Sequence, residues 1–95
     1  MPLLAIDSAE VRRAAELLRS MGASEVFVFG SAAHGSLRPD SDVDLAVSGL
    51  PARLYLTAAS KASDVFGRPV DLVDLDDLTP RVQYLLASGE LVRVG

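Results

Sequence analysis

The sequence VFVFGSAAHGSLRPDSDVDL, residues 26–45, holds two apolar segments joined by a polar loop. Residues 26–29 are typical of a buried strand, which ends at Gly30. The second segment carries Asp42 and Asp44. Because side chains two apart project from the same face of a strand, their carboxylates are expected to converge on one or two metal ions. The Gly-Ser turn before them can offer backbone N–H groups and a hydroxyl to phosphate.

Charge and composition restrict what the chain can bind. Its formal net charge is −4 at neutral pH, so independent binding of duplex nucleic acid, which needs a positive patch, is not expected. An acidic protein also repels a triphosphate, and divalent cations such as Mg²⁺ are expected to neutralise the aspartates before a nucleotide arrives. The sequence contains no cysteine, which excludes disulfides and thiolate zinc sites.

The size and hydropathy of the chain are those of one small domain. It has 95 residues, 49% of them hydrophobic, and residues 1–95 are expected to form a single domain with one core. No apolar run approaches the roughly 18 residues of a membrane span, so no membrane partner is expected. The first residues lack the basic segment and cleavage site of a secretory signal. Together these features favour the cytoplasm.

Apolar spacing and capping residues predict alternating helices and strands in an α/β fold. The first helix is expected from Asp7 or Ser8 to about Met21, with Gly22 at its end. A short helical turn is expected near Ser31. The later elements are a loop at 38–41, a strand at 42–48, a helix at about 52–66, a strand at 70–73, a helix at about 80–88 after Thr79, and a short strand at 91–94.

Small and acidic residues recur at a distinctive spacing in and after the polar loop. They are Gly30, Ser31, Gly35, Ser41, Asp42, Asp44 and Leu45. This pattern resembles the signature of the DNA polymerase β-like nucleotidyltransferase superfamily. The short chain is most similar to the minimal nucleotidyltransferases (MNT), which are the antitoxins of HEPN/MNT toxin–antitoxin pairs. The resemblance implies a small mixed β-sheet flanked by helices, similar to the palm of polymerase β.

The resemblance also assigns roles to three aspartates. Asp42, Asp44 and Asp71 would be the catalytic residues and would bind two Mg²⁺ ions, with Asp44 near the attacking group. Asp71 lies in the apolar run 69–73, where the family has its third carboxylate, and would also act as general base on the acceptor hydroxyl. From the residues alone, Asp71 could instead be an exposed residue of an edge strand, and Asp74 is a competing third ligand.

A second group of residues is expected to bind the nucleotide. Its members are Gly30, Ser31, His34, Gly35, Arg38 and Ser41. Gly30 and Ser31 would hold the β- and γ-phosphates, because glycine allows close backbone approach. The family usually has an arginine where this chain has His34, which is mostly uncharged at neutral pH. Arg38 could replace that arginine, or it could be a solvated loop residue.

The function implied by the resemblance is Mg²⁺-dependent transfer of AMP from ATP to a hydroxyl acceptor, with release of pyrophosphate. The acceptor would be a tyrosine or another side chain of a partner HEPN toxin. Two alternatives remain open: a non-catalytic antitoxin that neutralises a HEPN ribonuclease toxin by binding, and a nucleotidyltransferase that modifies a small molecule. Tyr55 and Tyr84 lie on predicted helices and are predicted to be packing residues rather than base-stacking ones.

Overall fold

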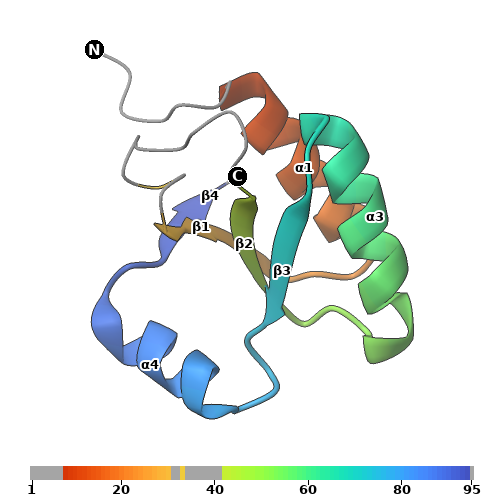
Figure 1. Ribbon diagram of the computed structural model, residues 1–95. Coiled ribbons are helices and arrows are strands. Elements are labelled where there is room, and N and C mark those ends of the chain that lie inside the picture. The colour runs from red at the N-terminus through yellow and green to blue at the C-terminus, as the bar shows by residue number, and fades with distance from the viewer. Residues whose placement is uncertain (1–7, 31–32, 34–41, 95) are drawn as a thin grey trace.

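The computed structural model describes residues 8–30, 33 and 42–94. This part of the chain contains three α-helices, one 3-10 turn and four strands. Figure 1 shows how they are arranged. In chain order they are α1 (Ser8–Ser20), β1 (Glu25–Phe29), β2 (Val43–Ser48), the 3-10 turn η1 (Ala52–Leu54), α3 (Tyr55–Phe66), β3 (Val70–Asp74), α4 (Pro80–Ser88) and β4 (Val92–Val94). None of these helices is long and apolar enough to cross a membrane.

The strands form one sheet in the order β3-β2-β1-β4. Strand β1 pairs antiparallel with β2 and β4, whereas β2 pairs parallel with β3. The parallel pair requires a crossover connection, which α3 provides between β2 and β3. This mixed sheet flanked by helices confirms the predicted fold class. The register places Asp44 between Phe29 of β1 and Asp71 of β3.

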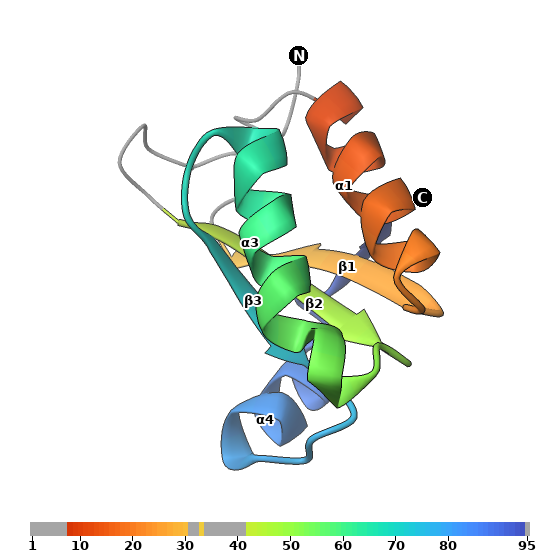
Figure 2. The same cartoon turned by 90° about the vertical axis from the view of Figure 1, so that its right-hand side faces the viewer.

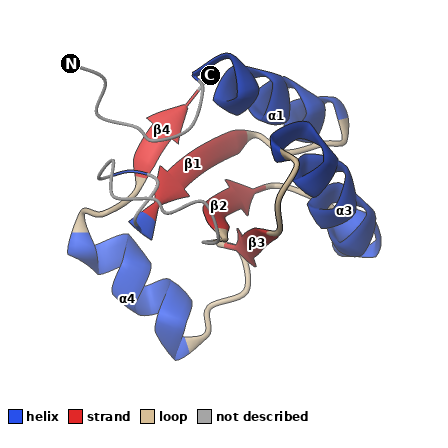
Figure 3. Cartoon of the chain, turned by 45° about the horizontal axis from the view of Figure 1, so that its top comes forward, coloured by secondary structure: helices blue, strands red, loops and turns tan. Residues whose placement is uncertain are grey.

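Helices cover both faces of the sheet (Figures 2 and 3). On one face, α1 and α3 pack on alternate strand residues in the larger buried cluster, which includes Val43, Leu45 and Leu72. On the other face, α4 contributes Val82 and Leu85 to a smaller cluster. Because strand side chains alternate between faces, Asp44 and Asp71 project from the face on which α4 packs. The fold thus leaves the two carboxylates beside the smaller cluster.

The predicted elements agree with the observed ones, with small shifts at their ends. The helix expected at 52–66 begins with η1, and β2 starts at Val43, so Asp42 directly precedes that strand rather than lying inside it. Thr79 caps α4 as expected, since its Oγ1 accepts a hydrogen bond from the Val82 N–H at 3.2 Å. The turn expected near Ser31 and the loop expected at 38–41 fall outside the described residues.

One packing prediction is wrong. Tyr84 is 64% exposed, because α4 turns only the side that carries Val82 and Leu85 toward the sheet. Its hydroxyl hydrogen-bonds with Glu90, and this contact raises the pKa of the phenol. The prediction is confirmed for Tyr55, which packs against the larger cluster.

Candidate functional site

Two aspartates meet on the face of the sheet that α4 partly covers. Asp44 of β2 and Asp71 of β3 are partners in the parallel register, so their side chains stand next to each other on the same face. Both are partly exposed, and Asp42, just before β2, is exposed. The structure therefore brings Asp44 and Asp71 side by side, and their assignment as metal ligands stays a prediction. Asp42 is close enough for its charge to act on Asp44.

Gly30 lies directly against the Asp44 carboxylate. A Cβ added to Gly30 would overlap Asp44 Oδ2 and would come within 3.2 Å of Asp44 Cγ. The glycine also has a φ of 65°, which L-residues with side chains rarely adopt. Both the space and the backbone conformation therefore require glycine here. Gly30 therefore makes room for the Asp44 carboxylate of β2, in addition to its predicted role in binding phosphate.

The carboxylates repel one another. The pKa of Asp44 is raised from its ordinary value, first by burial and then by the negative charges of Asp71 and Asp42. The positive charge of Arg81 opposes this effect in part. Ionised Asp44 is therefore in an environment that a further cation would stabilise.

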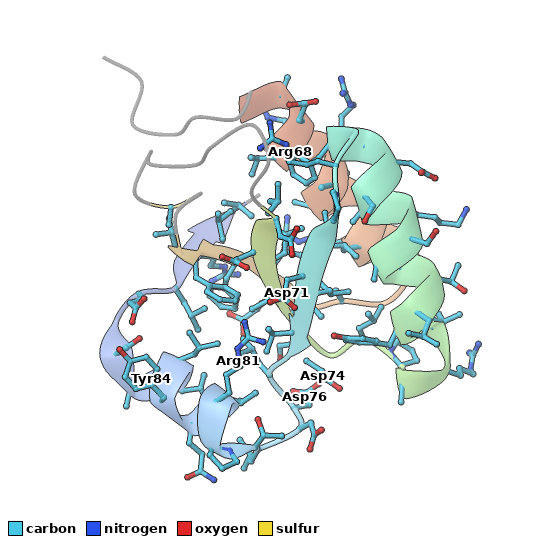
Figure 4. The ribbon with its side chains drawn as sticks, viewed as in Figure 1. Arg68, Asp71, Asp74, Asp76, Arg81 and Tyr84 are labelled. Atoms are coloured by element: carbon cyan, nitrogen blue, oxygen red, sulfur yellow. The ribbon has the colours of Figure 1, made fainter. Side chains whose placement is uncertain are left out.

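Arg81 is a site residue that the sequence reasoning missed. From the first turn of α4, its Nη2 donates a hydrogen bond to Asp71 Oδ2 at 2.8 Å. Figure 4 labels both side chains. The Arg81 guanidinium also lies over the Phe29 ring, 5.8 Å from the centroid. The hydrogen bond to Asp71 is the main cause of a raised Arg81 pKa. The sequence offers only a weak signal, because a cation in the first turn opposes the helix dipole but this position does not identify the carboxylate that Arg81 meets.

A cleft of about 480 Å³ opens beside Asp71. It is lined by Ala52, Tyr55, Leu56, Asp71, Leu72, Val73, Asp74, Asp77, Thr79, Arg81 and Val82, which come from η1, α3, β3, α4 and the segment before α4. Burial, followed by the negative charges of Asp71 and Asp74, raises the pKa of Tyr55. The side chain of Leu56 is 80% exposed at the rim. The cleft therefore gives solvent and solutes access to Asp71.

The neighbouring acids 74 and 76 have other roles. Asp74 lies opposite Val47 in the register, so it projects from the opposite face to Asp71, and its Oδ1 accepts the Asp76 N–H at 2.9 Å. Asp76 Oδ2 in turn accepts the Gly49 N–H at 2.7 Å. These contacts fasten the segment after β3 to the end of β2. They favour Asp71 over Asp74 as the partner of Asp44.

The structure also tests whether these residues suit a divalent cation. Among the described residues there is no group of three or more His, Cys, Asp or Glu side chains arranged to hold a metal ion. Mg²⁺ usually keeps several waters and needs only one or two protein carboxylates together with substrate phosphates. Asp44 and Asp71 supply two crowded carboxylates of this kind. The donor set therefore fits Mg²⁺, with Asp42 as a further acid nearby.

Five of the predicted nucleotide-binding residues remain predictions. They are Ser31, His34, Gly35, Arg38 and Ser41, and they lie outside the described residues. Gly30 is described, and it lies at the end of β1, next to Asp44. The candidate site is thus Gly30 directly after β1, two carboxylates on adjacent strands, and an arginine from α4 that pairs with one of them.

Sequence comparison places the chain in a family. Residues 15–93 match the family described as Polymerase beta, Nucleotidyltransferase. The chain therefore belongs to the polymerase β nucleotidyltransferase family and carries a nucleotidyltransferase domain. No curated protein matches the sequence significantly.

Solved structures refine this assignment. A protein described as a minimal nucleotidyltransferase superposes with a TM-score of 0.71 and 29% identity, over 94% of this chain and 97% of the other. A toxin–antitoxin structure with AMP-PNP gives a TM-score of 0.75 at 22% identity, over 93% of this chain and 72% of the other. A tri-AMPylated Shewanella oneidensis HEPN toxin in complex with an MNT antitoxin gives 0.66 at 22% identity, over 90% and 68%. The fold is therefore that of the MNT antitoxins.

Proposed function

We propose that this chain uses Mg²⁺ to transfer AMP from ATP to a hydroxyl side chain of a HEPN toxin, and that it acts in this way as an antitoxin. The observation that carries the proposal is the position of Asp44. Its carboxylate lies against Gly30, the first residue of the predicted phosphate-binding motif, and beside Asp71, the second carboxylate suited to metal. Similar structures that contain AMP-PNP or an AMPylated HEPN toxin support the choice of nucleotide and partner.

The reaction needs an activated hydroxyl and a neutralised phosphate. Asp42, Asp44 and Asp71 would hold Mg²⁺, which when bound polarises the α-phosphate and offsets charge on the pyrophosphate. The acceptor oxygen forms a bond to the α-phosphorus while the bond to pyrophosphate breaks. Asp71 takes the hydroxyl proton as general base, and the cleft beside it provides a route by which an acceptor side chain can reach its carboxylate.

The nucleotide-binding assignments complete the proposal. Gly30 and Ser31 would bind the β- and γ-phosphates, together with His34, Gly35, Arg38 and Ser41. These residues follow β1 or precede β2 in the sequence, so the triphosphate would lie on the side of Asp44 toward β1. The acceptor would approach on the other side, along the cleft at the edge strand β3. The cytoplasm, where ATP and Mg²⁺ are available, remains the predicted location.

The test is a transfer assay with the cognate HEPN protein. The two proteins are incubated with ATP and Mg²⁺, and intact-mass spectrometry follows the partner. We expect the mass of the HEPN protein to rise by one or more AMP groups, and expect Asp44→Asn and Asp71→Asn to abolish this increase. Asp64→Asn serves as a matched control, because Asp64 is an exposed acid on α3, on the opposite side of the sheet.

Two outcomes would favour the alternatives instead. If the HEPN ribonuclease is inhibited without gaining mass, and Asp44→Asn inhibits it equally well, the chain neutralises its partner by binding alone. If AMP is transferred to a small hydroxyl compound while the HEPN protein stays unmodified, the chain is a small-molecule nucleotidyltransferase. Either result would refute the proposed acceptor.

A further inference from the structure

Arg81 provides a fixed positive charge beside the two carboxylates. Its Nη2 lies 2.8 Å from Asp71 Oδ2, and Asp71 stands beside Asp44 in the parallel register. The side chains of Arg81 and Asp71 are 54% and 40% exposed, so the ion pair is accessible from solvent. Divalent cations could therefore reach the same Asp71 oxygens that Arg81 now contacts.

The fold holds Arg81 in this position by several independent contacts. The residue next to it, Val82, is buried in the smaller core cluster, which fixes the first turn of α4 on the sheet. Thr79 Oγ1, which accepts a hydrogen bond from the Val82 N–H, caps that turn at its start. The ring of Phe29, which is itself 5% exposed, lies beneath the guanidinium. The arginine is thus supported from the helix and from the sheet, while its charged end faces the carboxylates.

We propose that Arg81 is the counter-ion of the metal-free site, and that it competes with the divalent cation for Asp71. It is a positioning residue, because it orients the Asp71 carboxylate and offsets the repulsion between Asp71 and Asp44 before metal arrives. The inference rests on the proposed function in one respect, since it takes Asp44 and Asp71 to be metal ligands. The Arg81–Asp71 ion pair would therefore stabilise the metal-free fold and weaken the binding of metal at Asp71.

The test measures metal binding in the absence of nucleotide and partner. Mn²⁺, which can be followed by electron paramagnetic resonance, is titrated into the wild-type chain and into Arg81→Gln. An accessible ion pair is worth up to about 1 kcal/mol, so its removal should tighten Mn²⁺ binding about two- to fivefold. Arg81→Lys keeps the charge and should restore an affinity near that of the wild type.

Arg93→Gln is the matched control. Arg93 is also exposed and paired with an acid, Glu25, at 3.7 Å, but it lies on β4, at the opposite edge of the sheet from β3. Its substitution changes the net charge by the same amount as Arg81→Gln. We therefore expect Arg93→Gln to leave Mn²⁺ affinity unchanged. Equal tightening in both variants would indicate a general charge effect and would overturn the inference.

Other outcomes also decide the matter. Unchanged or weaker Mn²⁺ binding by Arg81→Gln would assign Arg81 a purely structural role and overturn the counter-ion proposal, while leaving the proposed transferase function intact. Failure of Mn²⁺ to bind any variant would overturn the counter-ion inference alone, because in the proposed transferase function the phosphates of ATP complete the metal site, and that function is tested by the transfer assay. If Arg81→Gln does not fold, the wild-type chain still gives an answer by NMR. The Arg81 Nε–H resonance should shift as Mg²⁺ is added, and a resonance unmoved at metal saturation would contradict the competition.

Discussion

Replacement of Gly30 by alanine tests the geometry of the site most directly. The new Cβ would overlap Asp44 Oδ2, so the Asp44 carboxylate would have to rotate away from residue 30. The φ of 65° adds a separate cost of about 1–2 kcal/mol, because an L-residue crowds its own carbonyl in that conformation. Displacement of the Asp44 side chain from its rotamer adds about 0.5–1.5 kcal/mol.

Gly67 offers an unusually close control. Its φ is 66°, and a Cβ added there would have no atom within 4 Å. Gly67→Ala therefore carries only the backbone cost, whereas Gly30→Ala carries the backbone cost and the clash. We expect the free energy of unfolding to fall about 1 kcal/mol further for Gly30→Ala, measured by urea denaturation of the metal-free proteins. In a domain of this size, the difference corresponds to a Tm that is lower by roughly 4–8 °C.

A double-mutant cycle isolates the clash. With Asp44→Ala, the nearest atom of residue 44 to the new Cβ would be the Asp44 Cβ position, 3.6 Å away, which is ordinary van der Waals contact. Gly30→Ala should then destabilise the Asp44→Ala protein no more than Gly67→Ala destabilises the wild type. Equal losses for Gly30→Ala and Gly67→Ala in the wild-type background would refute the close contact between Gly30 and Asp44.

Three further perturbations have defined outcomes. The pKa of Asp44 is raised in the folded state, so the metal-free protein loses stability as pH rises from the pKa of Asp44 in the unfolded chain to its pKa in the folded chain. Asp44→Asn should remove this pH-dependent loss of stability, measured by denaturation at a series of pH values. An unchanged pH profile would contradict the raised pKa. His34→Arg should tighten ATP binding about five- to hundredfold by calorimetry, if a charged hydrogen bond to phosphate of about 1–3 kcal/mol forms; unchanged affinity would mean that position 34 does not contact phosphate. Asp76→Ala should destabilise the fold by about 0.5–1.5 kcal/mol, because the exposed Gly49 N–H exchanges its carboxylate acceptor for water, whereas Asp77→Ala should have little effect.

The sequence predicts the elements well because local patterns determine them. Alternating apolar residues define β2 and β3, and Thr79 marks the start of α4 by a hydrogen bond within its own turn. The pairing of Asp44 with Asp71 also follows, once the crossover through α3 makes the two strands parallel neighbours. These features depend on residues that are close in sequence or on one simple topological rule.

The rest depends on tertiary contacts with no local pattern. Arg81 meets Asp71 only because α4 folds back onto the sheet, and nothing in the helix sequence shows how it folds back. Similarly, the acids 74 and 76 look alike in the sequence, yet Asp76 accepts the Gly49 N–H and Asp74 belongs to the opposite face from Asp71. Tyr84 is exposed because α4 buries only the side that carries Val82 and Leu85, and this orientation depends on how the helix packs on the sheet.

With Asp44 and Asp71 as the proposed metal ligands, the contacts of Gly30 and Arg81 would couple metal binding to stability in this fold. Gly30 leaves room for the Asp44 carboxylate, and the parallel register brings Asp71 beside it, so the fold concentrates negative charge that destabilises the metal-free protein. Arg81 offsets this repulsion only in part, since the pKa of Asp44 remains raised. A cation that binds the folded state alone adds stability that grows with the logarithm of its concentration relative to Kd. The loss of Arg81 should therefore lower the Tm without metal and increase the rise in Tm that saturating Mg²⁺ produces, a combination that a purely structural arginine would not give.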